Sequence, residues 1–113
     1  MMSDADALAS LSALAHEYRL RVFRLLVRRS PEGLAAGDIA AHMQLPPSSL
    51  SFHLGHLERA GLIASRREQR HIIYTANLSG MRHLLSFLAE DCCNGHPEVC
   101  AEPIPARRQS KAG

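Results

Sequence analysis

Apolar residues recur every three or four positions along much of the chain, which predicts helices with one buried face. Ser3 followed by Asp6 resembles a capping box, so a first helix is expected to begin there. Its apolar face consists of Leu8, Leu11, Leu14 and Ala15. A second helix over residues 17–29 has an apolar side formed by Leu20, Phe23 and Val27, thickened by Val22, Leu25 and Leu26. We expect a mostly solvated face from its arginines, Arg19, Arg21, Arg24, Arg28 and Arg29.

The middle of the chain predicts two short helices joined by a tight turn. The first covers about residues 36–43 and is stopped by Leu45-Pro46. Pro47 suits the first position of the second helix, where its missing N–H costs nothing. This helix runs to about residue 60 and ends at Gly61. Its core face is formed by Leu50, Leu54 and Leu57. Its outer face carries Ser48, Ser49, Ser51, Phe52 and His56, with His53 at the boundary.

Residues 62–76 predict a β-hairpin, and a last helix follows it. Two short β-branched or aromatic runs flank a charged centre, as is typical of two strands and a turn. The tip consists of Arg66, Arg67, Glu68, Gln69 and Arg70, and it lacks the glycine expected of a tight turn. The last helix covers about residues 78–92, with Met81, Leu84, Leu85 and Leu88 at helical spacing. Asn94-Gly95 and then Pro97 end it.

Length and composition fit one small domain. The chain has 113 residues, and no apolar run approaches the roughly 20 residues that a membrane-spanning helix needs. The N-terminal segment is acidic where a signal peptide would be basic, so we expect a cytoplasmic protein without a membrane partner. The formal net charge of +2 is too small to indicate nucleic-acid binding by itself. No nucleophile–base pairing or cofactor fingerprint is found, so an enzyme is not expected.

The order of elements predicts a mainly α (α+β) fold, a winged helix-turn-helix. In that arrangement the second helix fits the major groove of DNA and the hairpin lies along the flanking backbone. Hydroxyl and imidazole groups on the helix can hydrogen-bond to base edges or phosphates, and Arg66, Arg67 and Arg70 suit phosphate contacts. Periodicity alone does not separate this interpretation from an ordinary helical hairpin with a polar outer face.

Three segments together, residues 11–27, 36–63 and 65–76, resemble the ArsR/SmtB family of metal-responsive bacterial repressors. The most specific part is Ser48-x-x-Ser51-x-His53-Leu54-x-x-Leu57. The resemblance assigns DNA recognition to Ser48, Ser49, Ser51, Phe52 and His53. It also implies a homodimer, in which the first and last helices pair around a two-fold axis, bound to double-stranded operator DNA. We therefore expect a DNA-binding and dimerisation domain over residues 1–93, and a metalloid-binding loop with a flexible tail over 94–113.

Two sensor sites common in that family are missing from this sequence. Arsenic-responsive members often carry Cys-x-Cys near the start of the helix-turn-helix, where this chain has residues 34–38, LAAGD. Zinc-responsive members carry Asp, His and Glu ligands on the last helix. Here that helix has His83, with Glu90 and Asp91 near its end, and the spacing does not match. A sensor site in this chain must therefore lie elsewhere.

All three cysteines, Cys92, Cys93 and Cys100, lie within ten residues near the C-terminus. A reducing cytosol and an odd number of thiols disfavour a disulfide. Zinc could take a Cys3His set completed by His96, but adjacent cysteines suit a tetrahedral site poorly. A redox switch is disfavoured because the helix C-terminus and acidic neighbours raise the thiol pKa. Inert thiols are a further alternative.

Trivalent arsenic or antimony suits three sulfur ligands best, since each forms three bonds and keeps a lone pair. The metalloid displaces the thiol protons as it binds, so a lowered pKa is not required. The predicted function is a repressor released from its operator by As(III) or Sb(III) bound at the three cysteines. The alternatives are a zinc or other divalent-metal sensor, a methylarsenite sensor using only Cys92 and Cys93, and a thiol metal carrier that does not bind DNA.

Overall fold

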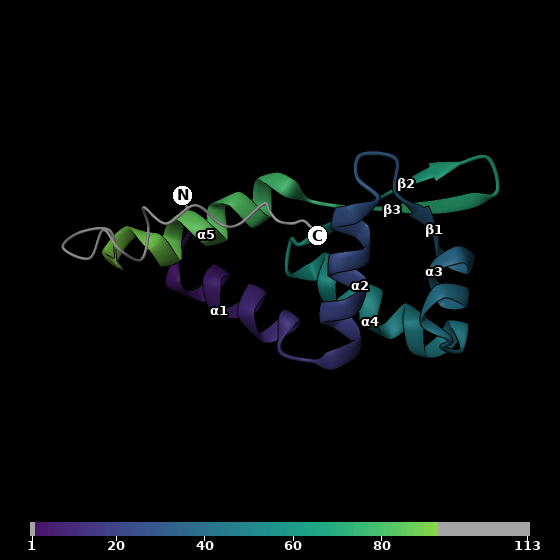
Figure 1. Cartoon of the computed structure of the whole chain (residues 1–113), viewed down its shortest axis with the longest axis horizontal. Coiled ribbons are helices and arrows are strands. Elements are labelled where there is room, and N and C mark those ends of the chain that lie inside the picture. Colours follow the sequence, from purple (N-terminus) through teal and green to yellow (C-terminus); the bar gives the residue numbers. More distant parts are fainter. Residues whose placement is uncertain (1, 93–113) are drawn as a thin grey trace, which may run out of the picture.

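The computed structural model describes residues 2–92; Met1 and residues 93–113 lie outside the described part. The predicted division of the chain at residue 93 lies outside the described residues and stays a prediction. Helices make up most of the described chain, and three short strands form one small sheet (Figure 1). The elements in chain order are α1 (Asp4–Leu14), α2 (Glu17–Arg28), β1 (Leu34–Ala35), α3 (Ala36–Met43), α4 (Pro47–Arg59), β2 (Ile63–Glu68), β3 (His71–Ala76) and α5 (Leu78–Cys92). The predicted mainly α winged helix-turn-helix is confirmed.

Local sequence signals set the helix ends. The Ser3 hydroxyl accepts a hydrogen bond from the Asp6 amide at 3.1 Å, and the Asp6 carboxylate accepts one from the Ser3 amide at 3.2 Å, so the capping box is confirmed. Pro47 takes the first helical position of α4, as predicted. Gln44 ends α3 in the left-handed region, with φ 57°. Gly61 follows α4 with φ 78°, a conformation that glycine adopts without strain.

The core lies where α2, α3 and α4 meet. Leu50, Leu54 and Leu57 are buried along one side of α4, as their spacing predicted. The buried apolar side of α2 consists of Val22, Phe23, Leu25 and Leu26. Leu20 is 42% exposed, so the prediction that it belongs to this side is wrong. The buried face of α2 is rotated toward Val22 and Leu26, which are both 0% exposed.

The sheet has the strand order β1-β3-β2, and both pairs are antiparallel. The hairpin is closed by two residues, Gln69 and Arg70, between the paired positions Glu68 and His71. Gln69 has φ 57° and so occupies the left-handed conformation that a glycine would normally supply. The first strand was not predicted, because its two residues carry no alternating pattern.

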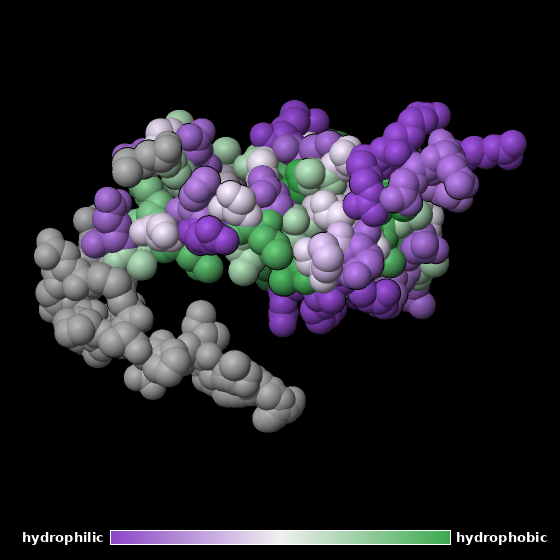
Figure 2. Space-filling model, turned by 90° about the horizontal axis from the view of Figure 1, so that it is seen from above, coloured by the Kyte–Doolittle hydropathy of each residue, from purple (hydrophilic) through white to green (hydrophobic). Residues whose placement is uncertain are grey.

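The two terminal helices, α1 and α5, lie side by side at the end of the molecule opposite the β2–β3 hairpin (Figure 1). They present exposed leucines: Leu8 (66% exposed) and Leu11 (40%) on α1, and Leu78 (47%), Leu85 (48%) and Leu88 (48%) on α5. Figure 2 shows hydrophilic side chains crowding the hairpin end, while hydrophobic patches remain open elsewhere. Among the described helices, none is long and apolar enough to span a membrane.

Candidate nucleic-acid interface

The outer face of α4 is polar at its N-terminal half, with one large apolar side chain. Ser48, Ser49 and Ser51 are exposed, and Phe52 is 64% exposed. No side chain caps the N-terminus of α4, so amide N–H groups of its first turn stay available to an outside acceptor. Hydroxyls and free amides together can bind phosphate oxygens or base edges. Four of the five α4 residues expected to recognise DNA thus share one open surface.

His53 is the exception among those five residues. Its side chain is only 9% exposed and is packed beneath the outer face of α4. The ring lies 4.7 Å from the His16 ring and 5.9 Å from the Tyr18 ring, centroid to centroid. A residue held this way supports the neighbouring side chains of the helix and has little surface left for a base.

The side chain that holds His53 is Arg19, which is 8% exposed. Its Nη1 lies 3.4 Å from His53 Nδ1, and its Nε donates to the carbonyl oxygen of Ala13 at 2.8 Å. The prediction that Arg19 belongs to a solvated face is wrong. The signal was present in the sequence: Arg19 lies three and four residues before Val22 and Phe23, on the same stripe of α2.

The environment of α4 favours the neutral form of its two histidines, because it lowers the pKa of both. Burial lowers the pKa of His53 below its usual 6.5, and the nearby His16, Arg19 and His56 lower it further. Desolvation, with Arg19 and Arg59 nearby, also lowers the pKa of His56. A neutral His53 can accept the hydrogen bond from Arg19 at Nδ1 while its proton stays on Nε2.

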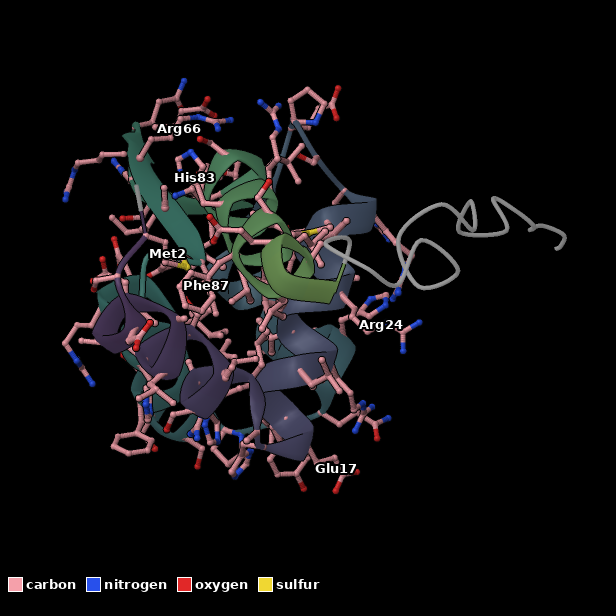
Figure 3. All side chains as sticks on the ribbon, turned by 90° about the vertical axis from the view of Figure 1, so that its left-hand side faces the viewer. Met2, Glu17, Arg24, Arg66, His83 and Phe87 are labelled. Carbon is pink, nitrogen blue, oxygen red and sulfur yellow. The ribbon has the colours of Figure 1, made fainter. Side chains whose placement is uncertain are left out.

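The three hairpin arginines differ in their surroundings. Arg66 donates through Nε to the Glu68 carboxylate at 3.0 Å and through Nη2 to the Glu32 carbonyl oxygen at 3.0 Å. Arg67 and Arg70 are exposed and make no ion pair with any residue in the 2–92 range. Figure 3 shows Arg66 on the opposite side of the molecule from Arg24 on α2. Arg67 and Arg70 are therefore the hairpin cations that are free to meet a phosphate.

Hydrogen bonds connect both terminal helices to the two residues that follow α4, Ala60 and Gly61. The Ser10 hydroxyl of α1 donates to the carbonyl oxygen of Ala60 at 3.4 Å. The Asn77 side chain, just before α5, donates to the carbonyl oxygen of Gly61 at 2.9 Å and accepts from the Gly80 amide at 3.1 Å. These hydrogen bonds connect the end of α4 to α1 and to the start of α5.

The predicted metalloid site falls at the edge of the described structure. Cys92 is the last residue of α5, its side chain lies outside the described part, and so do Cys93 and Cys100. Over the described part of the chain, no group of three or more His, Cys, Asp or Glu side chains could hold a metal ion. His83 lines a groove along α5 together with Met2 and Phe87 (Figure 3).

Residues 14–66 match the family model described as a helix-turn-helix domain. The nodulation protein NolR of Rhizobium meliloti is 33% identical over 88 residues, which cover 77% of this chain and 70% of NolR. The transcriptional activator HlyU of Vibrio cholerae is 29% identical over 94 residues, which cover 83% of this chain and 84% of HlyU. The residues matched by the family model include all of α4 and the start of β2, up to Arg66.

Solved structures agree on the fold. An ArsR-like transcriptional regulator from Rhodococcus superposes with a TM-score of 0.73 at 22% identity, covering 86% of this chain and 89% of that one. The homodimeric winged helix-turn-helix DNA-binding domain of a possible ArsR-family regulator from Mycobacterium bovis gives 0.63 at 24% identity, covering 84% and 93%. The chain therefore belongs to the family of winged helix-turn-helix transcriptional regulators, a class of DNA-binding proteins that are not enzymes.

Proposed function

We propose that this regulator is a homodimeric repressor that is released from operator DNA by trivalent arsenic or antimony bound at Cys92, Cys93 and Cys100. The observation that carries the proposal is the position of α5 (Leu78–Cys92). This helix carries exposed leucines, its start is bonded to the end of α4 through Asn77, and it ends at the first cysteine of the cluster. One helix thus links the thiols, the apolar face and the DNA-binding helix.

The leucines of α1 and α5 support the homodimer. Burying a leucine side chain stabilises a protein by about 1.5–3 kcal/mol. An isolated domain forgoes this stabilisation at five leucines on two adjacent helices, and a second copy of the chain could bury them. The related fold from Mycobacterium bovis is described as homodimeric. Leu85→Glu should therefore give a monomer in sedimentation equilibrium. Leu20→Glu is the matched control, since Leu20 is similarly exposed on α2 and should leave the dimer intact.

The hydrogen bonds at the end of α4 support a mechanism of release from DNA. In a dimer on dyad DNA, the two α4 helices must be about 34 Å apart, one turn of the duplex. A metalloid that ties Cys92 and Cys93 to Cys100 changes the end of α5, and with it the packing of the dimer. Asn77 passes that change to the Gly61 carbonyl at the end of α4. A coupling of about 1–3 kcal/mol, which is typical of allostery, weakens DNA binding 5- to 150-fold.

Fluorescence anisotropy with labelled promoter DNA of the protein's own gene tests the whole proposal. Arsenite and antimonite should release the wild-type protein, and zinc should not. Cys92→Ser, Cys93→Ser and Cys100→Ser should each bind DNA normally and resist arsenite. Methylarsenite shows whether the site uses two or three sulfur ligands. A methylated species that needs only Cys92 and Cys93 should still release the Cys100→Ser variant from DNA.

Each rival function predicts another outcome of that titration. Release by zinc, lost in His96→Ala, would identify a zinc sensor. A protein that binds metalloid but shows no preference for promoter over scrambled DNA would be a thiol carrier. The direction of regulation needs a reporter gene as well, since the relative HlyU is an activator. Higher reporter expression in cells lacking the regulator supports repression, and lower expression contradicts it.

A further inference from the structure

Phe52 is an exposed aromatic side chain that the dimer does not account for. Among residues 2–92, the other large apolar side chains left exposed are on α1, α2 and α5: Leu8, Leu11, Leu20, Leu78, Leu85 and Leu88. Phe52 alone lies on α4, with 64% of its surface exposed. It follows Ser48, Ser49 and Ser51, whose short hydroxyl side chains reach much less far from the helix. An apolar ring is therefore the most protruding group of this polar surface.

The ring of Phe52 is supported from beneath. Its centroid lies 5.6 Å from that of His53, with the ring planes at 69°, and 6.4 Å from that of His56, at 83°. These are edge-to-face arrangements, which favour one orientation of an aromatic ring. His53 is itself fixed by Arg19. The side chain is thus presented outward on a rigid base, so little conformational entropy is lost when it is buried by a ligand.

The chemistry of the major groove offers one apolar group to such a ring. The base edges in the major groove present hydrogen-bond donors and acceptors to a protein. The C5-methyl group of thymine is the apolar group among them. A phenyl ring cannot hydrogen-bond to the polar edges, and placing it against them would leave them desolvated. We propose that Phe52 is a specificity-determining residue that packs against the C5-methyl group of one thymine in each operator half-site. This inference rests on the operator binding proposed above and is independent of the metalloid.

The size of the effect follows from the burial of one methyl group. One such group is worth about 0.8 kcal/mol, so its removal from one half-site weakens binding about fourfold. Removal from both half-sites of a dimer weakens binding about fifteenfold if the two contacts are equivalent. Deoxyuridine lacks only this methyl group and keeps the hydrogen-bonding edge of thymine, so it isolates the contact.

The test replaces each thymine of the operator in turn by deoxyuridine and measures affinity by anisotropy. For the wild-type protein, one symmetric pair of thymines should show the fourfold loss per half-site. Phe52→Ala should bind the normal operator more weakly and no longer distinguish thymine from deoxyuridine. Phe52→Leu, which keeps an apolar group, should retain part of the discrimination. Ser51→Ala is the matched control on the same face, and its ratio of thymine to deoxyuridine affinity should equal that of the wild type.

The outcomes separate this inference from the proposed function. If the wild-type protein binds its operator specifically but no thymine is sensitive, Phe52 does not read a methyl group and the inference fails alone. Sensitivity that persists in Phe52→Ala assigns the methyl contact to another residue and also overturns it. Absence of any preference for the promoter over scrambled DNA overturns the proposed function and this inference together. A thermal unfolding curve of Phe52→Ala should show that this variant is folded, as expected for an exposed position.

Discussion

Arg19 and His53 form a buried contact that connects α2 to α4, the second helix of the helix-turn-helix, with Nη1 of Arg19 3.4 Å from Nδ1 of His53. The same guanidinium donates to the Ala13 carbonyl near the end of α1. A carbonyl in the last turn of a helix lacks an intrahelical donor, and a cation is favourable there. Arg19 thus joins three helices. Because arginine only donates hydrogen bonds, this geometry requires His53 to be neutral.

Arg19→Met should destabilise the domain by about 1–3 kcal/mol, because it leaves a buried carbonyl and a buried imidazole nitrogen without a donor. Urea unfolding measures this change. Arg21→Met is the matched control two positions away, since Arg21 is exposed and only meets Glu17 at 3.9 Å. Its effect should stay within about 0.5 kcal/mol. Equal stabilities for the two variants would show that the buried bonds of Arg19 contribute nothing.

Stability should fall as the pH drops below about 6.5, because His53 has a lowered pKa in the folded protein. The unfolded chain then binds more protons than the folded one between the folded pKa and 6.5. The stabilisation is therefore complete above 6.5 and is lost as the pH falls through the folded pKa. The groups that face His53 are His16, Tyr18 and Arg19 from the α2 side, and Phe52 and His56 on α4.

Urea unfolding between pH 5 and pH 8 tests this sign. His53→Asn supplies an amide oxygen that can still accept from Arg19, but it does not titrate. Its stability should change less with pH in this range than that of the wild type. Some slope should remain, because the pKa of His56 is also lowered. An unchanged slope in His53→Asn would assign the pH dependence to other groups.

Much of the fold was predictable because its signals are local. Pro47 and Gly61 bound α4, and the spacing of Leu50, Leu54 and Leu57 identifies its buried face. Short-range rules of capping and helical periodicity decide such features. The same rules indicated that Ser48, Ser49, Ser51 and Phe52 lie on the open face of α4, whereas their expected role in DNA recognition came from the family resemblance.

What the sequence did not reveal depends on contacts between distant residues. The burial of Arg19 requires the Ala13 carbonyl and the His53 ring to be in place, and His53 is 34 positions away. The charge of Arg19 suggested that its side chain is exposed to solvent, although its position within the apolar stripe of α2 suggested burial. Similarly, the pairing of Arg66 with the Glu32 carbonyl joins the hairpin to the loop after α2, across 34 residues.

The hairpin arginines should contribute unequally to DNA binding. Arg67 and Arg70 are open to a phosphate, whereas Arg66 is already bonded to Glu68 and Glu32. Each phosphate contact adds about 0.9 to the slope of log affinity against log salt concentration. Arg67→Ala and Arg70→Ala should each lower that slope by about one per half-site that they contact. Arg66→Ala should leave the slope nearly unchanged. A lower salt slope in Arg66→Ala, with unchanged slopes in Arg67→Ala and Arg70→Ala, would contradict this prediction.

Gly80 of α5 lies close to the carbonyl group of Gly61, which follows α4. A Cβ atom at this position would lie 2.6 Å from the Gly61 carbonyl oxygen and 3.0 Å from Nδ2 of Asn77. Gly80→Ala must therefore push α5 away from α4 and stretch the bond between Asn77 and Gly61. We expect a loss of about 1–3 kcal/mol in stability, as for other overpacked sites. Operator affinity should fall as well, because the same bond positions α4 relative to the terminal helices.

Gly37→Ala provides the matched control for Gly80→Ala. Gly37 lies inside α3, and a Cβ atom there would meet nothing within 4 Å. Alanine is favoured over glycine in a helix by up to about 1 kcal/mol, so this variant should be slightly more stable than the wild type. Urea unfolding and operator binding are measured for both. If Gly80→Ala binds the operator as tightly as Gly37→Ala does, the contact between α5 and the end of α4 does not set the position of the DNA-binding helix.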